Sequence, residues 1–181
     1  MSEARYFGYG SLVNRATHGH PGARRASVRG WRRIWRHTGL REVAFLTVVP
    51  DPGAEIDGLI ADVPQGDWSD LDLRERAYDR VPVAAADPVH IYTIPDGKHA
   101  PATTEHPVLL SYIDVVVQGY LREFGEDGVA RFFQTTSGWS APVADDRAAP
   151  RYSRHQRLSA DETALVDAHL AALSVRLFPG H

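Results

Sequence analysis

The feature that most constrains the fold of this chain is a short aromatic strand that runs directly into a glycine turn. Residues 6–14 read YFGYGSLVN. Aromatic side chains favour extended backbone, so we expect a strand over residues 5–9. Gly8 and Gly10 then let the main chain turn where a side chain would block it. Ser11 is expected to cap the helical turns that follow.

This turn is a candidate anion cradle. A strand that leads through a glycine turn into a helix start leaves several backbone N–H groups unpaired and pointing the same way, and such groups bind carboxylates, phosphates and oxyanions. A tight structural turn without a ligand is the alternative that the residues leave open. A dinucleotide fingerprint needs a third glycine, and a serine-hydrolase elbow needs glycine two places after the serine, but Val13 occupies both positions. The Gly-Lys-Ser/Thr of a phosphate loop is also absent.

The length and composition are those of an ordinary globular protein. The chain has 181 residues, of which 43% are hydrophobic and 24% charged, with a net charge of −3, so we expect one domain over residues 1–181. The longest apolar run, 43–49, is too short to cross a bilayer, and the N-terminus lacks the order of a signal peptide. We therefore expect a cytoplasmic protein without a membrane partner. With no cysteine in the sequence, any chemistry must use carboxylate, histidine, hydroxyl or backbone groups.

Arginine and tryptophan alternate over residues 23–37. Arg29, Trp31, Arg33 and Trp35 fall on one face at strand spacing. Aromatic side chains interleaved with arginine can bind single-stranded nucleic acid, but the acidic overall balance provides no long-range attraction to phosphate. A solvated strand face with stacked Trp–Arg pairs is the interpretation that we favour. We therefore expect no nucleic-acid partner, and single-stranded nucleic-acid binding through this strand remains an alternative.

The rest of the chain places strands before helices. Further strands are expected over 43–49, 56–63, 81–85 and 89–94, with a turn at 50–53 between the first two. Helices are expected over 67–77, 107–125 and 128–134, and a last one over 159–177 that a capping box at Ser159 and Glu162 begins. The segment 135–152 is a long loop, of a length that is often functional. This order predicts an α+β domain with a mostly antiparallel sheet.

Glu75 is the carboxylate with the most interesting surroundings. It sits at the expected end of a short helix, close in sequence to Leu73 and Tyr78. A carboxylate among apolar and aromatic side chains is disfavoured as an anion, so its pKa rises toward the range that is useful for proton transfer. The alternative is a surface ion pair with Arg74 or Arg76.

The histidines and serines carry no comparable pattern. His18 and His20 are two residues apart, and neither has a histidine at helical spacing or a nearby carboxylate that would complete a zinc motif. No Ser/His/Asp order is marked by its local sequence. The residues therefore predict no metal site.

Taken together, these motifs resemble the γ-glutamylcyclotransferase-like superfamily, which includes γ-glutamylcyclotransferases, the ChaC branch and AIG2-like proteins. The resemblance spans most of the chain, from residue 5 to about residue 157. Four short segments carry it: YFGYGSL at 6–12, WRR at 31–33, LDLRE at 71–75 and PRY at 150–152.

The resemblance implies a fold and a reaction. The fold is a small mixed, mostly antiparallel sheet curled into a partial barrel, with flanking helices and a ligand pocket at its mouth. In the reaction, the α-amine of a γ-glutamyl compound attacks its own γ-carbonyl, closes 5-oxoproline and releases an amine or amino acid. No cofactor or metal takes part, and the partner is a small-molecule γ-glutamyl substrate.

The resemblance also implies roles for particular residues. Glu75 would be the catalytic acid and base, and Tyr152 would contact the carboxylate region of the substrate. Tyr78, which follows Glu75 as a tyrosine does in the ChaC branch, is a further substrate-binding candidate. The glutamyl part would be held by Tyr9, Gly10, Ser11 and Leu12.

The chemistry agrees with the residues, because the nucleophile belongs to the substrate and no cysteine or serine nucleophile is needed. There is one departure. The ChaC branch follows its glutamate with Gly-Gly-Tyr, whereas Glu75 is followed by Arg76 and Ala77, so strict glutathione specificity is not expected. The leaving group stays open, and the loop over 135–152 is a candidate lid or leaving-group pocket. A non-catalytic binding module for small carboxylates is the alternative function on the same fold.

Overall fold

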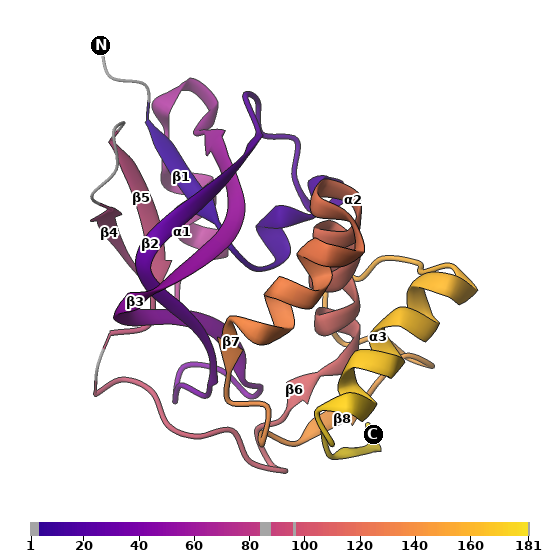
Figure 1. The fold of residues 1–181 in the computed structure, drawn as a ribbon. Coiled ribbons are helices and arrows are strands. Elements are labelled where there is room, and N and C mark those ends of the chain that lie inside the picture. The colour runs from indigo at the N-terminus through magenta and orange to yellow at the C-terminus, as the bar shows by residue number, and fades with distance from the viewer. Residues whose placement is uncertain (1–3, 84–87, 96, 181) are drawn as a thin grey trace.

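A computed structural model describes residues 4–83, 88–95 and 97–180 of the protein (Figure 1). The strands are β1 (Arg5–Gly8), β2 (Arg24–Arg36), β3 (Phe45–Asp62), β4 (Asp79–Val83), β5 (Val89–Thr93), β6 (Val108–Leu109), β7 (Thr136–Ser137), β8 (Val143–Asp145) and β9 (Leu177–Pro179). The α-helices are α1 (Ser69–Arg74), α2 (Leu110–Gln134) and α3 (Ala160–Ala172). Short 3₁₀ turns cover Ser11–Val13, Arg15–Thr17 and Pro64–Gly66.

The main sheet has the strand order β4-β5-β1-β3-β2-β7. The pairs β4–β5, β1–β3 and β2–β3 are antiparallel, whereas β1–β5 and β2–β7 are parallel. This confirms the expected α+β class with a mixed, mostly antiparallel sheet and flanking helices. The sheet is curved but stays open between its edge strands β4 and β7, so it does not close into a barrel. A second, parallel sheet, β6-β8-β9, lies below α2 and α3 and was not expected from the sequence.

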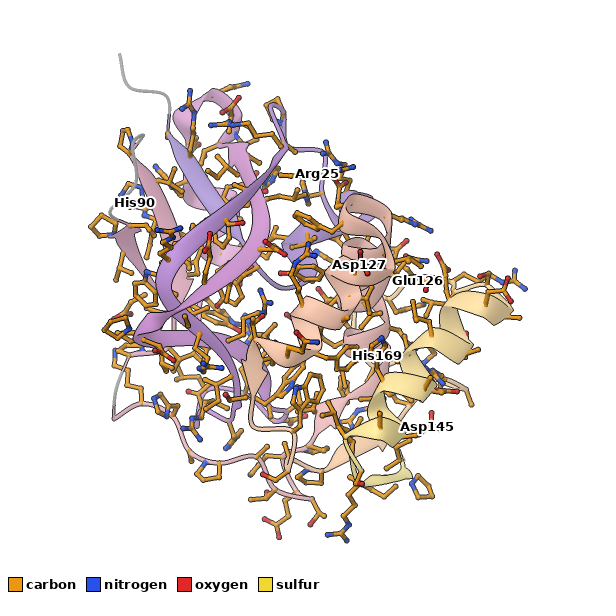
Figure 2. The ribbon with its side chains drawn as sticks, viewed as in Figure 1. Arg25, His90, Glu126, Asp127, Asp145 and His169 are labelled. Carbon is orange, nitrogen blue, oxygen red and sulfur yellow. The ribbon has the colours of Figure 1, made fainter. Side chains whose placement is uncertain are left out.

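Helix α2 covers the inner face of the main sheet, and α3 packs on the other side of α2 (Figure 1). Buried Val116, Tyr120 and Phe132 of α2 join Leu46 and Ile56 of β3 in one core. The contact between the two helices includes an aromatic stack at His169, in the last turn of α3, a residue that Figure 2 labels. There the ring of His169 lies parallel to that of Phe133, with 4.6 Å between centroids.

The strands β2 and β3 form one long hairpin, and two expectations fail there. The turn expected at 50–53 does not separate two strands, because β3 runs through it and pairs with β2 on both sides. The register shifts between Arg29 and Trp31, where Gly30 has a φ of 84°. Four residues of β3, 51–54, lie opposite the single residue Gly30 in this bulge, and the buried side chains of β2 change face there. As a result Arg29 is exposed while Arg33 is fully buried.

The prediction of a solvated strand face with stacked Trp–Arg pairs is therefore wrong. Arg33 and Trp35 are both in the core, with exposed fractions of 0% and 2%. The Arg33 guanidinium donates to Thr136 Oγ1 at 3.0 Å and to the Tyr120 hydroxyl at 2.9 Å, and it ties β2 to β7 and α2. Burial lowers the pKa of Arg33. Single-stranded nucleic acid that bound through this strand would have to contact Arg33 and Trp35, and both of these side chains are buried.

The helix boundaries differ from the expected ones where tertiary contacts intervene. The capping box at the start of α3 is present, with Ser159 and Glu162 exchanging hydrogen bonds of 2.9 and 3.1 Å. However, α3 ends at Ala172 rather than at 177, and β9 follows after Ser174, which has a φ of 52°. Helix α2 spans both predicted helices, with a kink at Gly125, whose φ is 69°. The expected long loop contains β7 and β8.

Across the part of the chain that the structure describes, no helix is both long enough and apolar enough to cross a membrane.

Candidate functional site

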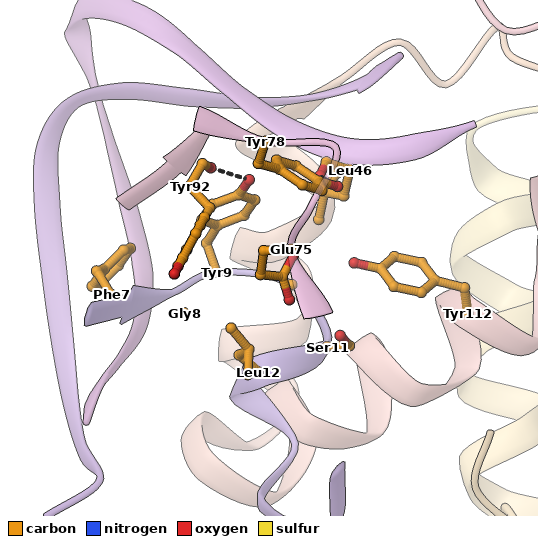
Figure 3. Close-up of a pocket in the computed structure, with 11 residues that line it drawn as sticks. Phe7, Gly8, Tyr9, Ser11, Leu12, Leu46, Glu75, Tyr78, Tyr92 and Tyr112 are labelled. Carbon is orange, nitrogen blue, oxygen red and sulfur yellow. Dashed lines mark hydrogen bonds between the residues drawn. The ribbon is translucent and has the colours of Figure 1, made fainter. Parts of the chain in front are cut away.

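The glycine turn after β1 and the end of α1 face each other across a pocket, which we call the inner pocket (Figure 3). Its empty volume is about 320 Å³, including its opening to solvent. It is lined by Phe7, Gly8, Tyr9, Gly10, Ser11, Leu12, Leu46, Glu75, Tyr78, Tyr92 and Tyr112.

The turn is built on close backbone approaches that only glycine allows. A Cβ on Gly58 of β3 would overlap the carbonyl oxygen of Gly8, which explains the glycine in the middle of a strand. Gly10, not Ser11, is the N-cap of the first 3₁₀ turn, so the expected capping role of Ser11 is wrong. The first hydrogen bond of that turn runs from Val13 N to Gly10 O at 3.0 Å. The N–H groups of the residues before Val13 therefore have no partner inside the turn.

Glu75 faces this turn from the end of α1. Asp67 accepts a hydrogen bond from Ser69 N at 2.9 Å just ahead of α1, whose N-cap is Trp68, and Glu75 N closes the helix on Leu71 O at 2.9 Å. The Glu75 side chain is 16% exposed, and its Oε1 lies 3.2 Å from Arg74 Nε. Burial raises the pKa of Glu75, and the positive charges of nearby arginines, first of all Arg74, oppose that rise. The expected surface ion pair is thus an ion pair in a largely buried position.

Arg74 also connects Glu75 to the glycine turn, a role that the sequence did not reveal. Its guanidinium donates to Ser11 Oγ at 3.2 Å and to Thr17 at both the carbonyl oxygen (3.1 Å) and the hydroxyl (3.2 Å). Its side chain is only 9% exposed. Arg74 therefore fixes the distance between the helix end and the turn.

Two tyrosines of the inner pocket, Tyr9 and Tyr78, present rings rather than free hydroxyls. The Tyr9 hydroxyl donates to the carbonyl oxygen of Tyr92 at 2.6 Å, a bond drawn in Figure 3. The Tyr78 hydroxyl donates to the carbonyl oxygen of Leu46 at 2.8 Å. Burial raises the pKa of both tyrosines well above its usual range. Both side chains are therefore held rigidly by the main chain.

Tyr112 is a pocket residue that sequence reasoning missed. It projects from the first turn of α2 toward Ser11 (Figure 3), and a Cβ on Gly10 would lie 2.6 Å from its hydroxyl oxygen. Burial raises the pKa of Tyr112, while hydrogen bonding from Ser11 lowers it. The ring packs edge-on against Trp35 at 5.9 Å and against Tyr152 at 5.0 Å between centroids. The long helix that carries Tyr112 gives no local sign of a site.

A wider cavity adjoins the inner pocket, and we call it the outer pocket. Its empty volume is about 660 Å³, again including the opening. It shares Ser11, Glu75, Tyr78 and Tyr112 with the inner pocket. Its own lining residues are Arg41, Val43, Phe45, Arg74, Leu109, Arg151, Tyr152, Ser153 and Arg154.

The structure brings most of the expected site residues together. The inner pocket contains Tyr9, Gly10, Ser11, Leu12, Glu75 and Tyr78. Tyr152 lies in the outer pocket, where its ring packs edge-on against that of Tyr112. The lining residues that sequence reasoning missed include Arg41, Arg74, Tyr92 and Tyr112.

The histidines near the turn are structural. His18 and His20 lie 4.9 Å apart between ring centroids, and each has a hydrogen-bond partner, Leu12 O at 2.9 Å and the Tyr6 hydroxyl at 2.8 Å. Burial lowers the pKa of His18 to about 4, so the ring is neutral at neutral pH. Within residues 4–83, 88–95 and 97–180, no group of three or more His, Asp or Glu side chains is placed to hold a metal ion.

Comparison with known proteins defines the class to which this fold and pocket belong. The sequence profile of the family described as "Gamma-glutamyl cyclotransferase, AIG2-like" matches residues 6–113, more than half of the chain. The chain therefore belongs to this family. No curated protein matches the chain significantly.

Solved structures show the same fold at low sequence identity. A structure titled "Gamma-glutamyl cyclotransferase" is 14% identical, with a TM-score of 0.53, over 92% of this chain and 99% of that one. An uncharacterised protein from Homo sapiens is also 14% identical, with a TM-score of 0.55 and the same coverage. YkqA from Bacillus subtilis is 17% identical, with a TM-score of 0.56, over 74% of this chain and 54% of that one.

Proposed function

We propose that this protein is a γ-glutamyl cyclotransferase, which converts a γ-glutamyl compound to 5-oxoproline and releases an amine or amino acid. The observation that carries the proposal is the position of Glu75. A largely buried carboxylate with a raised pKa faces the glycine turn across the inner pocket. Family membership supports the same chemistry.

Glu75 would move the proton. The α-amine of the substrate must lose a proton before its nitrogen can attack the γ-carbonyl carbon. A carboxylate takes up that proton more readily when its pKa is raised. The new C–N bond closes the lactam, the old amide C–N bond breaks, and Glu75 returns the proton to the leaving nitrogen. Water is neither consumed nor released.

The glycine turn and Tyr112 would stabilise the oxygen that becomes negative. The N–H of Ser11 has no partner inside its turn, and the hydrogen bonding between Ser11 and the Tyr112 hydroxyl brings both donors to the wall of the inner pocket. Because burial raises the pKa of Tyr112, its hydroxyl keeps its proton and can donate it in a hydrogen bond. Loss of one such donor typically lowers the rate by about a hundredfold or more.

The rigid walls would fold the substrate. A γ-glutamyl chain has several rotatable bonds, and cyclisation requires its amine to lie against its own carbonyl. Because Tyr9 and Tyr78 are fixed by bonds to main-chain carbonyls, the pocket offers one shape. Holding reactants in the reactive geometry can remove a large part of an entropic barrier.

Incubation with γ-glutamyl amino acids, γ-glutamyl amines and glutathione, with 5-oxoproline measured by chromatography, tests the proposal. We expect 5-oxoproline from at least one class, and its loss in Glu75→Gln with an unchanged circular dichroism spectrum. Asp70→Asn, an exposed acid on the same helix, is the matched control and should retain activity. Binding of these compounds without any turnover would overturn the proposal in favour of a non-catalytic binding module.

A further inference from the structure

The carbonyl group of Tyr9, which opens the glycine turn, is held from inside the core. The Tyr120 hydroxyl of α2 donates to Tyr9 O at 2.8 Å. Tyr120 has an exposed fraction of 0% and is not among the residues that line the inner pocket. The glycine turn is therefore anchored from behind, by a side chain that lies outside the pocket.

A buried guanidinium controls which carbonyl receives the hydrogen of the Tyr120 hydroxyl. That hydroxyl also lies 2.6 Å from Asp57 O, and it has one hydrogen for two acceptors. Arg33 Nη1 donates to Asp57 O at 3.0 Å and to the Tyr120 hydroxyl oxygen at 2.9 Å. Because Arg33 supplies a donor to Asp57 O, the hydroxyl hydrogen is left for Tyr9 O. Arg33, Tyr120 and Tyr9 thus form a directed chain of hydrogen bonds.

Arg33 brings a positive charge to this chain without an ion pair in the described part of the protein. Its two further hydrogen bonds go to the hydroxyls of Thr135 and Thr136, at 2.6 and 3.0 Å. Asp57 is the acid whose charge acts on Arg33, but its carboxylate accepts from Arg131 at 2.7 Å. A charge is costly to bury without a carboxylate partner, and in such surroundings it polarises the hydrogen bonds that it makes.

The far end of the chain is the N–H of Gly10. In a planar trans peptide, the carbonyl and the following N–H point in opposite directions. With Tyr9 O directed at Tyr120, the Gly10 N–H points away from that part of the core, and Gly10 lines the inner pocket. No hydrogen bond of the described residues uses this N–H, although Gly10 is buried. Buried main-chain N–H groups without a partner are uncommon, and an oxygen of a bound ligand would supply the acceptor.

We propose that Arg33 and Tyr120 are positioning residues of the reaction, which aim the Gly10 N–H at the oxygen that becomes negative. They act through the peptide between Tyr9 and Gly10, whose carbonyl they hold in the core. The charge of Arg33, passed along the hydrogen bonds, makes the Gly10 N–H a stronger donor. The inference rests on the proposed function for the identity of that oxygen.

The variant Tyr120→Phe tests this role, because it removes the hydroxyl and keeps the ring in the core. We expect kcat to fall by about tenfold or more, toward the hundredfold that the loss of a whole donor costs. KM should change little, because Tyr120 does not line the pocket. Urea denaturation shows that the rate is measured on folded protein.

Tyr6→Phe is the matched control. Tyr6 also has an exposed fraction of 0%, its hydroxyl lies 2.8 Å from His20 Nδ1, and it does not line the inner pocket. This variant loses one buried hydroxyl in the strand that leads into the turn, and it should keep the wild-type kcat. An unchanged kcat in Tyr120→Phe, or an equal fall in both variants, would overturn the proposal.

Two substitutions of Arg33 test the charge itself. Arg33→Lys keeps the charge but lacks the planar fork of donors, and Arg33→Gln removes the charge. At similar KM, kcat should decrease from wild type to Arg33→Lys and further to Arg33→Gln. Equal kcat in these two variants would contradict the role of the charge.

An NMR readout separates this inference from the proposed function. The Gly10 amide resonance of protein with isotope-labelled glycine is compared among wild type, Tyr120→Phe and Tyr6→Phe, without substrate. Weaker polarisation should move the Gly10 amide proton to higher field in Tyr120→Phe and leave it in place in Tyr6→Phe. That result supports the chain even if no γ-glutamyl compound gives 5-oxoproline, a failure that would overturn the proposed function alone. An unmoved resonance in Tyr120→Phe would overturn the chain.

Discussion

The inner and outer pockets meet at Glu75, but they satisfy their polar side chains in different ways. In the inner pocket, the hydroxyls of Tyr9 and Tyr78 are used up by main-chain carbonyls. In the outer pocket, Arg151 and Arg154 have charged ends that face solvent. The inner pocket therefore has walls that the main chain holds in place, whereas the outer pocket presents positively charged side chains.

The difference suggests how one site can be strict about one half of a substrate and selective by charge for the other half. Rigid, hydrogen-bonded walls discriminate by shape, because a ligand that does not fit must break bonds that the protein has already made. Flexible charged side chains discriminate by sign, and they do so over a longer distance. Changes to the inner pocket should therefore affect catalysis or folding, and changes to the outer pocket should affect substrate choice.

The largest effect is expected at the point where the two pockets meet. Glu75→Gln keeps the shape of the side chain but removes proton transfer, so kcat should fall by about 10²–10⁴-fold. Rate measurements at saturating substrate will show it. A residual rate close to wild type would mean that Glu75 is only a structural ion-pair partner of Arg74. It would contradict the role of Glu75 in proton transfer.

A change behind the inner pocket should affect folding. Gly58→Ala introduces a Cβ that would overlap the carbonyl oxygen of Gly8 and lie 2.6 Å from Phe7 Cζ. We expect a loss of about 1–3 kcal/mol or more in the free energy of unfolding, measured by urea denaturation. Gly39→Ala is the control, because no atom lies within 4 Å of its Cβ. Equal stability of the two variants would show that the glycine turn can shift to make room for the new Cβ. It would contradict the description of the inner pocket as rigid.

A smaller effect is expected from one hydroxyl of the wall. Tyr78→Phe removes the bond to Leu46 O and should cost about 1 kcal/mol in unfolding free energy. The reaction rate should change little, because the ring remains in place. A large fall in kcat with unchanged stability would show instead that the hydroxyl exchanges its carbonyl partner for the substrate.

The smallest effect concerns pH. Glu75 must be deprotonated to accept a proton, and burial raises its pKa above the ordinary value of 4.5. Activity should therefore fall as pH decreases through this raised pKa. Arg154 is among the charges that lower the pKa of Glu75, so Arg154→Gln should move the acidic limb of the kcat/KM profile to higher pH. A shift to lower pH would contradict the assignment of that limb to Glu75.

Local signals in the sequence predicted local structure well. The capping box at Ser159 is present as expected, because it depends on residues within three positions. The helix expected from residue 67 instead begins at Ser69, after Trp68, which makes no side-chain cap. The strand and glycine turn at residues 5–12 also follow from their own residues. The turn and Glu75 line one pocket, as the family resemblance implied.

Pairing between distant segments decided the rest. The turn expected at 50–53 became strand because β2 pairs with β3 on both sides of it. The register shift at Gly30 reversed the faces of β2, which no spacing rule could show for Arg33. Arg41 reaches the site from the loop between β2 and β3, and Tyr112 reaches it through the packing of α2 on the sheet.

The edge-on contact of Tyr112 with Trp35 makes the indole a built-in optical probe. The two rings lie 5.9 Å apart at 82°, and Trp35 is sealed from solvent, so its emission reports on this neighbour rather than on bulk quenching. A compound that displaces Tyr112 on binding would change that fluorescence. Occupancy can thus be followed in an unlabelled sample, with Trp35→Phe, which keeps the other three tryptophans, as the reference that isolates the Trp35 signal.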